Sequence, residues 1–266
     1  MSATSRVRAE ASAAWRSFTR RRTAVFFTFF FPVILILIFA VLVQTNPGGG
    51  GLFAQPPGYY LPGYLAVVVL FTPLSRVGSE VARHREGNRF EKLATTPLSR
   101  AEWLLAHTLV NVAIIGIAGL LILGLMALVT GTASLALGPA NLALVAVFVA
   151  FAVALFCGLG AVLGGLADSQ DGVIAASNAI ALPLLFLSDT FVTPDLLPAW
   201  FRPAMNLSPL TYFARGVREL TYVPTGNEIV LPVVTFGESW EFNLAVLAVL
   251  TLVFFAAGTY AIPRTD

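Results

Sequence analysis

Charged side chains are scarce in this chain of 266 residues, of which Asp, Glu, Lys and Arg make up 11%. An average soluble domain carries about 25% charged residues. Hydrophobic residues account for 57% of the chain, and the mean hydropathy is +0.82. So few charges cannot form a water-soluble surface around so much apolar material. The composition therefore predicts an integral membrane protein.

Cysteine and the common catalytic motifs are missing as well. Cys157 is the single cysteine, so no disulfide can form within the chain, and we interpret it as a small packing residue. Lys92, the single lysine, has no glycine-rich loop before it, which excludes ATP binding in the P-loop manner. The sequence contains no H-E-x-x-H, no G-x-S-x-G and no cysteine pair. We therefore expect no catalytic residue, no metal and no cofactor in this chain.

Six apolar segments are long enough to cross a bilayer, which takes about 20 residues of helix. They lie at residues 24–43, 59–78, 103–129, 141–166, 172–191 and 242–262. Because lipid cannot satisfy open backbone groups, we expect an all-α membrane protein with six transmembrane helices, in which residues 1–266 form a single transmembrane domain. A secretory signal is excluded for the first segment by its length and by the lack of a small-x-small cleavage site after it.

The basic residues are unevenly distributed between the two sides of these spans. Six arginines lie in the N-terminal segment, six Lys or Arg residues lie between residues 76 and 100, and Arg264 follows the last span. The other side holds Arg202, Arg215 and Arg218. By the positive-inside rule, both termini and residues 80–102 are cytoplasmic, and residues 193–241 lie outside the cell membrane.

Two segments outside the spans have an amphipathic pattern. Residues 3–22 predict either an interfacial helix on an anionic membrane surface or a disordered basic tail. The apolar stripe of that helix consists of Val7, Ala11, Trp15 and Phe18. In residues 193–241, Ser208-Pro209 predicts a helix start. The stripe after it consists of Tyr212, Phe213, Val217 and Leu220. We expect external amphipathic helices that re-enter the membrane, because their stripes need an apolar environment.

Residues 80–102 are a charged island between two long apolar runs. Phe90 and Leu93 would share one face of a short amphipathic helix. Thr96-Pro97 ends that helix, because proline lacks a donor and restricts the residue before it. The sequence S-R-A-E that follows is a capping box, which starts the third span. A short polar helix between two spans is well suited to contact with a soluble partner.

The fifth span is the most polar one, with Ser177, Asn178, Pro183, Ser188 and Asp189. Three of these residues stand out: Asn178, Ser188 and Asp189. We regard them as candidates for a transport pathway or gate, since polar groups are costly in a bilayer without a function. For Asp189, a carboxylate at the membrane interface in contact with water is the favoured alternative.

Several other residues in the spans have structural interpretations. Gly160 and Gly164 form a G-x-x-x-G motif, which indicates close helix packing. His107 has no second histidine or carboxylate in register, so hydrogen bonding between helices or a hydrated vestibule is favoured over a metal site. Arg76 is expected to extend to the lipid headgroups at the end of the second span. Asp171 is interpreted as an acidic helix cap.

Two stretches of the chain resemble the permease subunits of ABC-2 type exporters. Residues 85–103, REGNRFEKLATTPLSRAEW, are similar to the charged coupling segment of that family, which ends in T-P-x-S-R. Residues 186–212, FLSDTFVTPDLLPAWFRPAMNLSPLTY, are similar to its fifth-span exit, external helix and N-P-L-T-Y segment. The order of the spans matches too. Two positions depart from the pattern: Asp189 stands where the family usually has a small residue, and Ser208 is inserted relative to N-P.

The resemblance implies a permease subunit that moves a hydrophobic, amphipathic, lipid-type or glycan-type substrate outward. The implied partners are two ABC ATPase subunits that carry ATP and Mg²⁺, a second permease that is identical or different, and the lipid membrane, with no nucleic acid. The implied contacts of a cytoplasmic coupling helix with the ATPase are Glu86, Gly87, Arg89, Phe90, Glu91, Lys92, Leu93, Thr96 and Pro97.

Two other functions remain open. The first is a membrane scaffold or sensor subunit that binds a soluble partner without transport. The second is an intramembrane enzyme that uses Asp168, Asp171 or Asp189.

Overall fold

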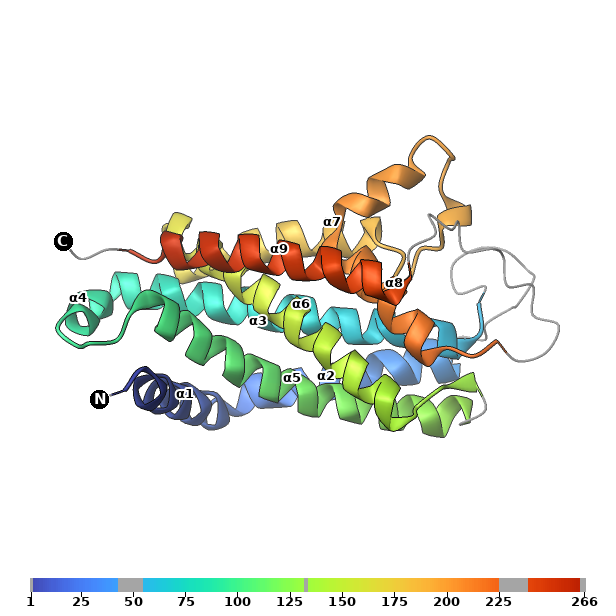
Figure 1. The fold of residues 1–266 in the computed structure, drawn as a ribbon, viewed down its shortest axis with the longest axis horizontal. Helices are drawn as coiled ribbons and strands as arrows, with labels where there is room; N and C mark the ends of the chain where they lie inside the picture. Colours follow the sequence, from blue (N-terminus) through green and yellow to red (C-terminus); the bar gives the residue numbers. More distant parts are fainter. Residues whose placement is uncertain (1, 43–54, 132–133, 225–238, 264–266) are drawn as a thin grey trace.

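The computed structural model describes residues 2–42, 55–131, 134–224 and 239–263. Six helices in this part of the chain are long and apolar enough to cross a membrane: Arg22–Leu42, Pro57–Glu86, Arg100–Thr130, Pro139–Leu166, Gln170–Leu187 and Trp240–Ala261. They form an elongated bundle (Figure 1). The predicted all-α membrane protein with six spans is therefore confirmed.

The spans are divided into the following elements. They are α2 (Arg22–Ile36) with a π-helical turn (Leu37–Leu42), a 3₁₀ turn (Pro57–Tyr60) with α3 (Leu61–Glu86), α5 (Arg100–Thr130), α6 (Pro139–Leu166), α7 (Gln170–Leu187) and α9 (Trp240–Ala261). Outside the spans, the described residues also form α1 (Ala3–Arg20), α4 (Arg89–Ala94), α8 (Pro209–Thr221) and two 3₁₀ turns (Pro194–Leu196 and Arg202–Leu207). Residues 43–54, between the first two spans, and Arg264 lie outside the described residues.

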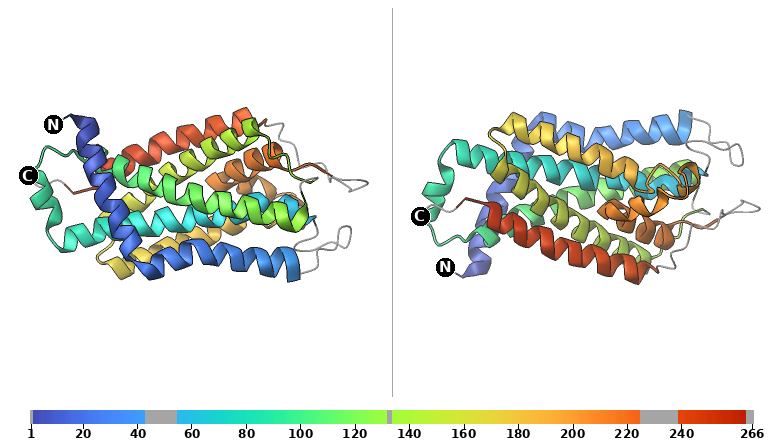
Figure 2. Two further views of the ribbon diagram at one scale, coloured as in Figure 1. Left: turned by 90° about the horizontal axis from the view of Figure 1, so that it is seen from below. Right: turned by 90° about the horizontal axis from the view of Figure 1, so that it is seen from above.

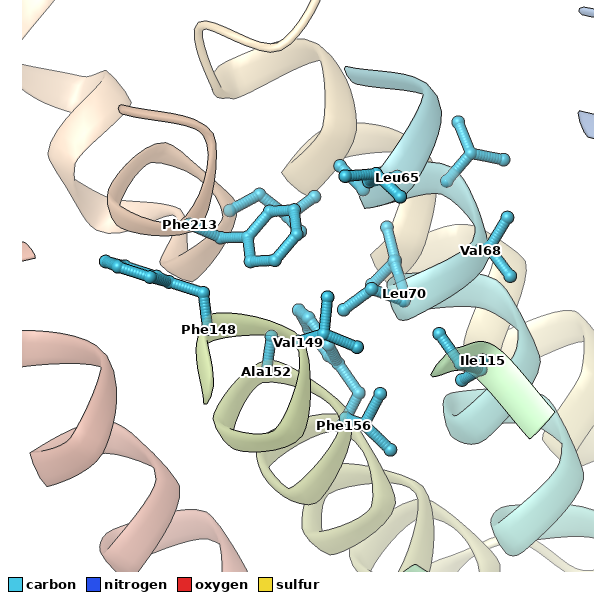
Figure 3. Packing of buried hydrophobic residues seen from close by; sticks show 14 of the residues in the cluster. Leu65, Val68, Leu70, Ile115, Phe148, Val149, Ala152, Phe156 and Phe213 are labelled. Carbon is cyan, nitrogen blue, oxygen red and sulfur yellow. The ribbon is translucent and has the colours of Figure 1, made fainter. Parts of the chain in front are cut away.

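Helix α3 is the centre of the bundle. It packs against α5, α6, α7 and α8. In the most apolar 18-residue stretch of each span, 67% is buried for the α3 span and only 11% for the α2 span. Leu65 and Leu70 of α3 belong to the same buried cluster as Phe148 and Phe156 of α6 (Figure 3). Most of the residues of α3 are therefore enclosed by other helices of the bundle.

Glycines allow α6 to approach both α3 and α9 closely. A Cβ added to Gly164 of α6 would lie 2.3 Å from the carbonyl oxygen of Gly78 on α3. On another face of α6, a Cβ added to Gly158 would lie 2.4 Å from the carbonyl oxygen of Phe254 on α9. Contacts this short leave no room for a side chain. The packing role predicted for Gly160 and Gly164 is confirmed.

Helix α3 is longer than the sequence predicts. The second span was expected to end near residue 78, but the helix continues to Glu86. Glu80 pairs with Arg83 and His84 at helical spacing, and Val81 is fully buried. Ion pairs three and four residues apart support a helix. The charged island therefore begins on the same helix as the second span, and α4 is its only separate helix among the described residues.

The two ends of the bundle differ. The start of α1, the end of α9 and helix α4 lie at one end, and α8 lies towards the other (Figure 1). Helix α1 crosses the ends of the spans and packs against α5 (Figure 2). Ala14 and Phe18 are its buried residues, whereas Trp15, which the predicted stripe included, is 37% exposed.

Helix α8 buries its apolar stripe in the bundle instead of in lipid. It packs against α3, α6 and α9. Phe213 and Val217 are fully buried, and a Cβ at Gly216 would meet the Phe148 ring at 2.2 Å. The predicted start at Ser208-Pro209 is confirmed, although the Ser208 hydroxyl donates to the carbonyl of Leu184 rather than capping its own helix. The expected re-entrant helix is thus enclosed by protein.

The start of α7 corrects one detail of the sequence analysis. Asp171, which was expected to be the cap, lies in the first turn. Ser169 caps the helix instead, because its Oγ accepts a hydrogen bond of 3.1 Å from the backbone N–H of Gly172. The acidic residue still complements the positive end of the helix dipole.

Candidate functional site

The segment between α3 and α5 folds as a compact hairpin around α4. The N–H of Gly87 donates to the carbonyl of Arg83, which closes the end of α3. Asn88 follows with a positive φ of 50°, a conformation that asparagine tolerates better than most residues. The chain then forms α4 and reverses again before Ser99, the cap of α5.

Phe90 fixes α4 to the rest of the protein. Its ring centroid lies 5.3 Å from that of His84 on α3 and 5.7 Å from that of Trp103 on α5. The side chain is only 8% exposed, and Leu93 beside it is half-buried against the same core. Among the predicted contacts with an ATPase, Phe90 therefore faces inward.

The other predicted contact residues form the outer surface of this hairpin. Exposed residues among them are Glu86, Gly87, Arg89, Glu91, Lys92, Thr96 and Pro97. The carboxylate of Glu86 also accepts a hydrogen bond of 2.9 Å from the backbone N–H of Gln170 at the start of α7. The hairpin thus presents charges of both signs on a short helix whose inner face is anchored.

Helix α1 is tied to α5 beside this hairpin. The predicted capping box is confirmed, because Ser99 Oγ accepts from the N–H of Glu102 and Glu102 Oε2 accepts from the N–H of Ser99. Arg6 Nε donates to the same Glu102 oxygen at 3.1 Å, and this hydrogen bond raises the pKa of Arg6. His107 Nε2 lies 3.2 Å from Glu10 Oε1, which confirms the predicted interhelical hydrogen bonding.

Arg85 joins the end of α3 to the end of α6, a contact that sequence reasoning missed. Its Nη1 donates to the carbonyl of Gly165 at 2.6 Å, and its Nη2 donates to the carbonyl of Ala167. These carbonyls lie at the C-terminal end of α6, where backbone acceptors have no helical partner. The only sequence signal was a basic residue in the last turn of α3, which does not identify a partner 80 residues away.

A cavity of about 900 Å³ lies between α2, α3 and α7, with the ends of α1 and α5 at its base. Its walls are mostly aromatic and aliphatic. The aromatic lining comprises Phe18, Phe27, Phe31, Phe39, Phe71, Phe186 and Phe191. The charged residues in its lining are Arg21, Arg76 and Glu80. Cavities of roughly 300–1,000 Å³ with few polar groups are typical of small-molecule sites.

The three predicted pathway residues are separated in the structure. Asn178 lines the cavity. Ser188 and Asp189 are buried elsewhere, beyond the end of α7. Arg76, expected to reach the headgroups, instead lines the cavity and donates to Asn111 and to the carbonyl of Ala14. These two hydrogen bonds connect α3 to α5 and to α1, which sequence reasoning did not predict.

Asp189 belongs to a buried ion-pair cluster. Its side chain is 0% exposed, so the alternative of a carboxylate in interfacial water was wrong. Arg215 Nε donates to Asp189 Oδ2 at 2.9 Å, and Arg218 Nη1 lies 3.6 Å from Asp189 Oδ1. Arg218 Nε also donates to the carbonyl of Tyr59. The cluster joins the end of α7 to α8 and to the beginning of the α3 span.

Comparison with known proteins adds two findings. The sequence model of the ABC-2 type transporter family matches residues 6–222. The daunorubicin resistance ABC transporter permease protein DrrB1 of Streptomyces coeruleorubidus is similar to this chain, with 26% identity over 172 residues. The aligned region covers 63% of this chain and spans 58% of the length of that relative.

Proposed function

Because this chain belongs to the ABC-2 type transporter family, we propose that it is the permease subunit of an ATP-driven exporter whose ATP hydrolysis takes place on a separate protein. The observation that carries this proposal is the hairpin around α4. It exposes charged residues on a short helix, and Phe90 fixes that helix to both adjoining spans. The chain has no P-loop motif of its own.

The proposed partner of the hairpin is an ABC ATPase subunit, which supplies ATP and Mg²⁺. In the proposed assembly, two permeases and two ATPase subunits associate. The exposed residues of mixed charge around Arg89 and Lys92 suit a polar docking surface, where charge complementarity sets the orientation and rate of association. The hairpin and both termini are proposed to face the cytoplasm, in agreement with the distribution of arginines.

A contiguous path of side chains connects the hairpin to the cavity. Phe90 contacts Trp103, and the Trp103 ring lies 4.0 Å from that of His107, measured between centroids. His107 lines the cavity and bonds to Glu10 of α1. Movement of α4 by an ATPase would therefore displace groups at the base of the cavity. We propose this path as the mechanical coupling between ATP turnover and substrate release.

The proposed substrate is hydrophobic or amphipathic and is moved outward. The aromatic lining of the cavity supports this class, because flat apolar ligands pack well against phenylalanine rings. The name of the similar permease, which refers to daunorubicin resistance, agrees with export of a small molecule. Lipid-type or glycan-type substrates belong to the same proposal.

The decisive experiment is co-purification with the ABC ATPase encoded beside this chain, followed by ATP turnover in lipid. Reversing two exposed charges of α4, with Arg89→Glu and Lys92→Glu together, should weaken association by about tenfold or more, because reversed charges repel a complementary surface. ATP turnover in the complex should fall with it. Phe90→Asp is less informative, because Phe90 is buried and its loss would disturb the hairpin itself.

The matched control reverses two exposed charges at the other end of the bundle, with Asp195→Lys and Glu219→Lys. This variant should retain full association. Full recovery of the ATPase by the α4 variant would contradict the docking proposal. A stable unmutated chain that recruits no ATPase would favour a scaffold or sensor subunit instead.

A further inference from the structure

Arg76 is half-buried, and its guanidinium is bonded to neutral groups. Its Nη1 donates to Asn111 Oδ1 at 3.3 Å, and its Nη2 donates to the carbonyl of Ala14 at 3.2 Å. The guanidinium carbon lies 4.7 Å from the centre of the Phe18 ring. No ion pair joins Arg76 to a carboxylate in the part of the chain that the structure describes. Buried cations are normally paired with an anion.

The carboxylate next to Arg76 is already shared by other cations. Glu80 lies one turn further along α3 and lines the same cavity. It is paired with Arg83 and, at 3.6 Å, with Arg21, and the His84 ring lies beside it, with Nε2 3.4 Å from Oε1. Of the charged side chains that line the cavity, two are arginines and one is a glutamate. The charged end of the cavity therefore carries a positive excess.

Hydroxyl groups surround this charged end. Thr72, Ser75 and Ser79 lie on α3 within one turn of Arg76 on either side, and all three line the cavity. Hydroxyl groups donate hydrogen bonds to the oxygens of carboxylates and phosphates. Arginine adds a planar set of donors that suits the same oxygens, and this pairing is among the strong hydrogen bonds of proteins.

The remainder of the cavity is an apolar channel of suitable length for a tail. On α3 its lining extends from Glu80 to Val67, which corresponds to about 20 Å of helix at 1.5 Å per residue. Phe27 of α2 and Phe186 of α7 are each 59% exposed, so the channel opens sideways between these two helices. Figure 2 shows α2 at the edge of the bundle with α7 as its neighbour on that side.

We propose that this cavity binds an amphiphile with an anionic head group, a carboxylate or a phosphate. The head group lies against Arg76 and Arg21, and the apolar tail extends between α2 and α7. This inference rests on the proposed transport function and names the charge of the molecule that enters the cavity. A cationic head group would meet two guanidinium groups and a carboxylate that is already paired.

The test is a binding measurement on the full chain in phosphatidylcholine nanodiscs, without ATP. The probes share one pyrene-labelled dodecyl tail and carry a phosphate, a trimethylammonium or an uncharged hydroxyl head. Partition into nanodiscs without protein is subtracted. The phosphate probe should bind about tenfold tighter than the trimethylammonium probe, which is the scale of one charge-assisted hydrogen bond.

Variants assign the effect to the arginines of the cavity. Arg76→Gln should lower the affinity for the phosphate probe by about tenfold and leave the uncharged probe unchanged. Because Arg76 also joins α3 to α1 and α5, Arg21→Gln provides a second variant at a side chain that is 44% exposed. Arg16→Gln removes an equal charge from exposed α1 outside the cavity lining, and it should change nothing.

The outcomes are distinct. Equal affinity for the phosphate and trimethylammonium probes, or phosphate binding that neither Arg76→Gln nor Arg21→Gln reduces, would overturn the proposal. Competition by added phosphatidylglycerol would identify a resident membrane lipid, whereas ATP-dependent movement of the phosphate probe by the complex would identify an exported molecule. Because binding is measured without the ATPase, a failed ATPase association would count against the transport function and not against the charge preference.

Discussion

Asp189 is a charged residue whose side chain is completely buried. One fully buried carboxylate lies between Arg215 and Arg218, and Arg218 stacks on Tyr59 with its guanidinium carbon 4.0 Å from the ring centre. Removing these charges from water is costly, and their mutual attraction must offset that cost. The cluster is therefore a strong joint between α8 and the beginning of the α3 span.

Replacing Asp189 with asparagine should destabilise the protein by about 3–5 kcal/mol, because it removes the buried carboxylate that pairs with Arg215 and with the buried Arg218. The thermal unfolding midpoint in detergent should fall accordingly. Asp195→Asn is the matched control, since Asp195 is exposed in the same segment and should have almost no effect. An unchanged midpoint for Asp189→Asn would show that the cluster does not stabilise the fold.

At the scale of elements, the spacing between α3 and α6 depends on glycine. Backbone atoms of Gly78 and Leu74 lie where side chains at Gly164 and Gly160 would project. Helices that approach this closely gain backbone and side-chain contacts that larger residues prevent. Because α3 also carries the cavity wall and the start of the hairpin, this packing positions both proposed functional regions.

Gly164→Ala should therefore destabilise the protein by about 1–3 kcal/mol, the usual cost of overpacking. The added Cβ would lie 2.3 Å from the carbonyl oxygen of Gly78 and 2.7 Å from Cβ of Val81. Gly124→Ala on α5 has nothing within 4 Å and should be neutral. Both midpoints can be measured by thermal unfolding in the same detergent, and an equal response would contradict the assignment of close packing to Gly164.

At the scale of the whole molecule, the two ends of the bundle carry different groups of charged residues. One end holds α1, the end of α9 and the charged hairpin, and α8 lies towards the other end with its buried ion pairs (Figure 1). The cavity opens sideways between them, along α2 and α7. In the proposed exporter, the first end meets the ATPase and the cavity receives its ligand from the plane of the membrane.

Single-cysteine labelling tests this orientation. In a Cys157→Ala background, Lys92→Cys and Asp195→Cys place one thiol on an exposed residue at each end. A membrane-impermeant maleimide applied to intact cells should label residue 195 and leave residue 92 unlabelled until the cells are opened, as the distribution of arginines predicts. Labelling of residue 92 in intact cells would reverse the proposed topology.

Much of the fold could be predicted from local patterns. The six spans follow from apolar length, the start of α5 from its S-R-A-E capping box, and close helix packing at Gly160 and Gly164 from their spacing, although the partner helix α3 was not predicted. The hairpin around α4 could also be located from a local pattern, because the helix break at Thr96-Pro97 depends on neighbouring residues alone. The predicted contacts of its residues with an ATPase stay predictions.

The sequence by itself determined which segments are helices, because hydropathy, capping and proline act within a few residues. Only the tertiary structure decided the environment of the charged side chains. Arg76 lies in a cavity wall with hydrogen bonds to α5 and α1, and Asp189 pairs with arginines 26 and 29 positions away. Phe90 faces inward because Trp103 and His84 enclose it. The energy of a charge depends on which groups surround it, and in this bundle those groups come from distant parts of the chain.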